Sequence, residues 1–146
     1  MKRIISLCIL VIGALVAFNA QADKRIEAKQ LPLSAQTFLK ANFGKDPVVS
    51  AHKGGTFKTE YKVTLRSGAK IEFDNKGEWE EVQCRYSDTG VPKNVVPESI
   101  RKYVEKNYSG TRIVEIDRDH SKYEISLSNG IDLDFSLNGD FLRVDD

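Results

Sequence analysis

Apolar and polar residues alternate in four short segments of the chain, two in each half. The segments are residues 61–65 and 71–73 in the first half and residues 123–127 and 131–135 in the second. A period of two residues is typical of a β-strand with one buried face. Ser67-Gly68 and Asn129-Gly130 separate the two segments of each half. Both dipeptides predict tight hairpin turns.

Two more strands are predicted in each half. The β-branched runs at residues 48–49 and 113–116 indicate a strand before the hairpin. Turns at residues 75–77 and 137–139 lead into a last strand at residues 79–83 and 141–144. Each half therefore contains four consecutive strands, which predicts an antiparallel meander.

A helical pattern precedes each set of strands. The apolar residues lie at spacings of three and four, which places them on one face of a helix. These residues are Ala35, Phe38, Leu39 and Phe43 in the first half and Ile100, Tyr103, Val104 and Tyr108 in the second. Pro32 and Pro97 suit the first turn of each helix, and Gly44 and Gly110 act as stop signals.

The two halves are copies of one unit. Leu31–Ser34 matches Val96–Ser99 at an offset of 65 residues, and positions from Tyr61 to Val82 match those from Tyr123 to Val144 at an offset of 62. A three-residue deletion opposite the loop around Gly54 reconciles the offsets, since loops tolerate such changes. One unit of about 50 residues makes a marginal core, whereas two units in one sheet make an adequate one.

The sequence therefore predicts an α+β fold, a tandem repeat of two α-β4 units that form one antiparallel sheet with both helices on one face. The expected organisation is a signal peptide at 1–22, a loose or helical N-terminal lead-in at 23–30, a first repeat at 31–84, a linker at 85–95 and a second repeat at 96–146.

The first 22 residues have the features of a secretory signal peptide. A positive start is followed by an apolar run from Ile4 to Phe18, and Ala20 and Ala22 occupy the −3 and −1 positions of a cut after Ala22. The run is short for a membrane-spanning helix, which needs about 20 residues. An uncleaved N-terminal anchor is the alternative. We expect a periplasmic or secreted protein with no membrane span after cleavage.

Cleavage changes both charge and cysteine content. Removing 22 of the 146 residues, Lys2 and Arg3 among them, leaves 124 residues and takes the formal net charge from +1 to −1. This balance provides no basic field for a nucleic acid. Cys84 is then the single cysteine, which excludes an intramolecular disulfide. We interpret it as a half-buried residue at a strand end with little reactivity.

The residues offer no catalytic set and no evident metal site. The only histidines, His52 and His120, are expected in loops and do not align between the repeats. They fall short of the three or four ligands that zinc requires. Five aspartates could attract Ca²⁺ but lack the spacing of a calcium loop: Asp132, Asp134, Asp140, Asp145 and Asp146. No nucleophile motif or phosphate loop occurs, so we predict no enzyme activity, cofactor or metal.

The outward strand positions form the candidate site, because two helices can cover only one face of the sheet. Trp79 and Phe141 lie three residues from Val82 and Val144, so strict alternation places both rings on the open face as binding anchors. A bulge after Gly77 or Gly139 would instead return them to the core. The predicted partner-binding residues are Trp79, Phe141, Glu60, Lys62, Arg66, Lys70, Glu72, Lys122, Glu124, Asp132 and Asp134.

The repeated motif resembles a known family. A signal peptide is followed by two copies of Leu/Val-Pro-x-Ser, a helix ending in an aromatic residue, Tyr-x-Val/Ile-x-Leu-x-x-Gly and Phe-(x)3-Gly-x-aromatic. This arrangement is similar to the PepSY-like, β-lactamase-inhibitor-like proteins exported mostly by Bacteroidota, over Leu31–Asp146. The resemblance implies a tandem α-β4 fold with a curved antiparallel sheet. It implies no catalytic residues, because none is established for the family.

We therefore expect a small exported binding protein without catalytic activity. Its partner would be an envelope or secreted protein or peptide, which it would bind on the open sheet face and inhibit or regulate. The alternative is a periplasmic protein that binds or senses a small ligand or metal ion. A small hydrolase using aspartate and histidine is a third hypothesis.

Overall fold

The computed structural model describes residues 23–145 of the protein. The expected signal peptide therefore lies outside the described residues, as does Asp146. Within residues 23–145, two α-helices and eight strands follow one another in the order predicted for a duplicated unit, preceded by one additional short strand, β1. The first unit contains α1 (Leu33–Phe43), β2 (Val48–Gly54), β3 (Glu60–Leu65), β4 (Lys70–Phe73) and β5 (Trp79–Gln83). The second contains α2 (Glu98–Asn107), β6 (Ile113–Arg118), β7 (Lys122–Leu127), β8 (Asp132–Ser136) and β9 (Phe141–Asp145).

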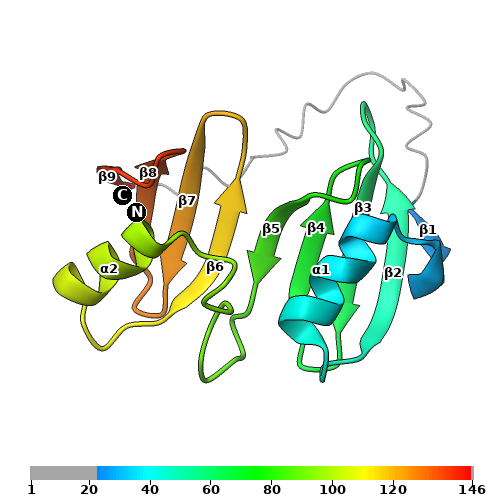
Figure 1. Cartoon of the computed structure of the whole chain (residues 1–146), viewed down its shortest axis with the longest axis horizontal. Helices are drawn as coiled ribbons and strands as arrows, with labels where there is room; N and C mark the ends of the chain where they lie inside the picture. The colour runs from blue at the N-terminus through cyan, green and yellow to red at the C-terminus, as the bar shows by residue number, and fades with distance from the viewer. Residues whose placement is uncertain (1–22, 146) are drawn as a thin grey trace, which may run out of the picture.

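All nine strands form one antiparallel sheet in chain order, β1 to β9. Both helices lie on the same face of this sheet (Figure 1). The predicted fold class is thus confirmed. The lead-in differs from the expectation, because Lys24–Ile26 forms β1 and pairs with β2, and a short 3-10 helix follows at Ala28–Gln30.

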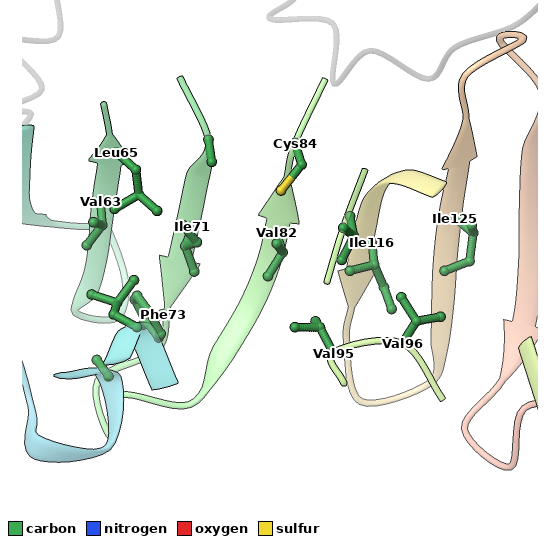
Figure 2. Close-up of a cluster of buried hydrophobic side chains, with 14 of the residues drawn as sticks. Val63, Leu65, Ile71, Phe73, Val82, Cys84, Val95, Val96, Ile116 and Ile125 are labelled. Atoms are coloured by element: carbon green, nitrogen blue, oxygen red, sulfur yellow. The ribbon is translucent and has the colours of Figure 1, made fainter. Parts of the chain in front are cut away.

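One hydrophobic core runs under both helices. Alternate residues of the strands point into it, and Ile71, Val82, Ile116, Ile125 and Leu133 are completely buried. The two units share this core at the junction of β5 and β6, where Val82 pairs with Ile116. Val95 at the end of the linker and Val96 at the start of the second repeat fill the space beside this pair (Figure 2). A fully buried apolar side chain of this size contributes about 1.5–3 kcal/mol, so this shared core joins the two units.

The last strand of each unit begins with a bulge. In the first unit Glu72 pairs with Glu81 but Phe73 pairs with Trp79, which leaves Glu80 without an opposite residue. In the second unit Asp134 pairs with Arg143 and Phe135 pairs with Phe141, which leaves Leu142 without an opposite residue. An extra residue reverses the side-chain alternation from that point onward.

The turns before these bulges pack against the starts of the helices. Gly77 and Gly139 have φ of 82° and 84°. A Cβ at either glycine would collide with the Oγ of Ser34 or of Ser99. Ser34 Oγ donates a hydrogen bond of 2.5 Å to the Lys76 carbonyl. Glycine is therefore required at each of these two positions for two reasons, the left-handed backbone conformation and the close approach of the helix.

Candidate functional site

The polar residues predicted to face outward lie on the face of the sheet opposite the helices. Their neighbours along each strand, such as Val63, Ile71 and Ile125, belong to the core, so alternation sends the polar side chains the other way. Arg66 is exposed in the turn after β3. The predicted set found on this open face is Glu60, Lys62, Lys70, Glu72, Lys122, Glu124, Asp132 and Asp134.

Trp79 and Phe141 do not lie on the open face, so the prediction that they are anchors there is wrong. The bulges at β5 and β9 turn both rings toward the helices. The Trp79 ring lies 6.3 Å from that of Phe38 on α1. Phe141 stacks on Tyr103 of α2 with ring centroids 4.6 Å apart. Both rings therefore pack on the helix side of the sheet, Trp79 against the core and Phe141 at its margin with 37% of its surface exposed.

Acidic residues from five neighbouring strands stand side by side on the open face. The strand registers pair them in sequence across β4 to β8. We call this set the acidic row: Glu72, Glu81, Asp117, Glu124 and Asp134. Since neighbouring strands are about 4.8 Å apart, the row is about 19 Å long. Directly opposed like charges destabilise a sheet, so this arrangement opposes folding.

Basic residues neutralise the two ends of the acidic row. Lys62 on β3 is opposite Glu72, and their charged atoms are 3.7 Å apart. At the other end Asp134 accepts hydrogen bonds of 2.9 Å from Lys122 and from Arg143. Asp134 was expected on a solvated face, but only 1% of its surface is exposed, because the strands and basic side chains around it exclude water.

The middle of the row has no such partners. Among residues 23–145, no salt bridge joins Glu81 or Asp117 to a basic side chain. Burial raises the pKa of Glu81 to about 8, helped by the charges of Glu115 and Glu72. Burial also raises the pKa of Asp117 to about 6, helped by Glu124 and Glu115. The centre of the open face therefore favours either a bound proton or an added positive charge.

Sequence reasoning missed several residues of this face because it listed outward polar positions for the middle strands and, on the last strands, followed only the two aromatic residues. Counting outward from Val82 and Ile116 also places Glu81, Glu115 and Asp117 opposite the core. That signal was present in the sequence. Their direct apposition across strands was not, because it depends on the register of β5 against β6.

The other candidate chemical groups are not assembled into a site. His52 lies within β2, opposite Lys62, and not in a loop as expected. His120 is exposed in the turn between β6 and β7. Cys84 is a free cysteine just after β5, which confirms its position at a strand end. It is not half-buried as expected, because only 3% of its surface is exposed. Burial raises the pKa of its thiol to about 11, with a contribution from Asp46, so the nucleophilic thiolate is suppressed.

Similarity to solved structures is high over nearly the whole described chain. A protein of Bacteroides thetaiotaomicron described as a "putative calcium-regulated periplasmic protein" is 38% identical, with a TM-score of 0.83 over 87% of this chain and 99% of that one. A "putative periplasmic protein" of Bacteroides vulgatus is 41% identical, with a TM-score of 0.81 and the same coverage. Another from the same species, of unknown function, is 33% identical with a TM-score of 0.79, over 85% of this chain and 99% of that one.

No helix within residues 23–145 is long and apolar enough to cross a membrane. No curated protein matches the chain. Residues 59–143 match the family described as "Putative beta-lactamase-inhibitor-like, PepSY-like". This match spans more than half of the chain and agrees with the nine-stranded sheet, and the chain belongs to the PepSY-like family.

Proposed function

We propose that this is an exported, non-catalytic binding protein that recognises a basic segment of a protein or peptide on the open face of its sheet. The observation that supports the proposal is the centre of the acidic row, where no basic side chain in the described part of the chain pairs with the carboxyl groups. Glu81 and Asp117 are opposed across β5 and β6 without a basic partner among residues 23–145. The periplasmic description of its structural relatives is consistent with a partner in the envelope.

The dimensions of the acidic row suit an extended segment. A row of about 19 Å accommodates roughly six residues of extended chain, which rises about 3.3 Å per residue. Lysine or arginine side chains of such a segment could reach the carboxylates of Glu81 and Asp117 together. Complementary charge of this kind mainly speeds association and selects the partner, and it weakens as salt increases.

Binding of a basic segment should release protons. The Glu81 carboxyl, with a pKa of about 8, is largely protonated at neutral pH. A cation beside it favours the ionised form and so lowers its pKa. Affinity is therefore expected to increase as pH rises from about 6 to about 8.5, the range in which the free protein loses the proton.

A labelled oligolysine peptide tests this proposal directly by fluorescence anisotropy. The Glu81→Gln/Asp117→Asn double variant should weaken binding about tenfold or more, since each interaction with a charged group contributes about 1.5–3 kcal/mol. The control is Glu98→Gln/Glu105→Gln, which removes two exposed charges from α2 on the opposite face. Equal weakening by both double variants would show that only net charge matters. No binding of the peptide even at low salt would contradict the proposal itself.

A further inference from the structure

Three carboxylates from neighbouring strands converge at the β9 end of the open face. Glu124 on β7, Asp134 on β8 and Asp145 on β9 each place one carboxylate oxygen within 4.8 Å of the other two. Glu124 is directly opposite Asp134. Asp145 lies two residues from Arg143, which is opposite Asp134, so alternation brings its side chain to the same face and a diagonal position.

The buried member of this group has an oxygen with no partner. Asp134 is 1% exposed, and its Oδ2 accepts both hydrogen bonds from Lys122 and Arg143. Its Oδ1 has no hydrogen-bond partner within residues 23–145. Buried carboxylate oxygens are normally satisfied, and an exception calls for an explanation such as an ion. The two basic residues thus satisfy one oxygen and leave the other available as a ligand.

We infer that Glu124, Asp134 and Asp145 form a binding site for a divalent cation that prefers oxygen ligands, of the Ca²⁺ type. Carboxylates are the ligands that such hard cations select. The group contains no histidine or cysteine, which argues against zinc. Ca²⁺ accepts irregular geometry and completes its shell with water, as a site open to solvent at Glu124 allows.

Lys122 is the natural competitor of the cation. Its ammonium group lies 2.9 Å from Asp134 Oδ2 and 3.6 Å from Glu124 Oε1. A bound cation would repel this group and take its place beside Glu124. The three acidic and two basic side chains leave a net charge of −1 at the site, so affinity should be modest, in the range of about 0.1–1 mM found for many extracellular calcium modules. Removing the Lys122 charge should strengthen binding.

Calorimetric titration of the purified, EDTA-treated protein with CaCl₂ tests this site, with MgCl₂ as a second arm that should bind more weakly. We expect saturable binding that Asp145→Asn weakens about tenfold or more and that Lys122→Met strengthens several-fold. Asp140→Asn is the matched control, because it removes the same charge from the turn before β9 and should leave the affinity unchanged. Amide chemical shifts should move in β7 to β9 and remain constant in β2 to β4.

Two results would overturn the inference. One is the absence of saturable binding up to about 10 mM Ca²⁺, well above the affinity range of such modules. The other is equal weakening by Asp145→Asn and Asp140→Asn, which would indicate general charge attraction. Circular dichroism of each variant separates loss of the site from loss of the fold. Glu81→Gln should leave Ca²⁺ affinity unchanged, so this site and the proposed recognition of a basic segment can fail independently.

Discussion

Replacing Glu81 with glutamine should make the protein more stable in mildly alkaline solution and leave its stability unchanged in mild acid. Burial and neighbouring carboxylates raise the pKa of Glu81 from 4.5 to about 8. The folded protein therefore holds a proton that the unfolded chain releases above pH 4.5. Stability falls as pH rises from about 4.5 through about 8, and Asp117 adds a change of the same sign between 3.8 and about 6.

The size of the effect follows from the shift and from solvent screening. A shift from 4.5 to about 8 corresponds at full value to about 4.8 kcal/mol, because each pKa unit is about 1.36 kcal/mol. Glu81 is only half-buried, and water screens such interactions strongly. We therefore expect Glu81→Gln to stabilise the protein by about 1–2 kcal/mol at about pH 8.5 and by almost nothing at about pH 5.

Urea unfolding monitored by the fluorescence of the single tryptophan, Trp79, measures this difference. With a slope of about 1.5 kcal/mol per molar urea, the midpoint should rise by about 1 M at about pH 8.5. Glu105→Gln, on the exposed side of α2, should show no such pH-dependent gain. The reasoning fails if wild-type stability increases between these two pH values, or if wild type and Glu81→Gln follow parallel curves.

Three other predictions concern the core, a turn and the thiol. Phe135→Ala should reduce the free energy of unfolding by about 3–5 kcal/mol, because the ring is fully buried. In the same urea assay Phe141→Ala should reduce it by less than about 2 kcal/mol, because that ring is 37% exposed. Gly139→Ala should reduce the free energy of unfolding clearly more than Gly130→Ala does. Both glycines have positive φ, but only at Gly139 would the new Cβ collide with α2. Equal reductions would show that backbone strain alone explains the effect. Cys84 should react with a thiol reagent about a hundredfold more slowly in the native protein than in urea, because its thiol pKa is raised from 9.0 to about 11. A native rate equal to the rate in urea would contradict the burial of Cys84.

The sequence pattern predicted the repeated unit, the helix positions and the buried face of the two middle strands in each unit. Alternation around Ile71 and Ile125 is strong because one face of each strand is buried and the other is polar. The bulges could not be located in this way. Gly77 marks the turn, but the extra residue Glu80 becomes evident only when β5 is paired with β4.

The candidate site was predictable as a surface but not as an arrangement. Outward positions follow from alternation, whereas the acidic row depends on which residue stands opposite which across five strands. Asp134 illustrates the difference. Alternation correctly directs its side chain away from the helices, but its burial arises from Lys122 and Arg143 on the two adjacent strands, which lie 12 and 9 residues away in the sequence.

The short strand β1 has a consequence for how separate molecules meet. Each unit has a first strand, β2 or β6, and a last strand, β5 or β9, and the junction of β5 with β6 shows that these two edges fit each other. The edge of β9 in one molecule would fit the edge of β2 in the next in the same way. Such contacts would join molecules head to tail, and because the arrangement does not close on itself it would grow into a filament. In this protein β1 already occupies the edge of β2, with Ile26 opposite Ala51 as Val82 is opposite Ile116. The three residues of β1 therefore cover the edge at which such a filament would grow.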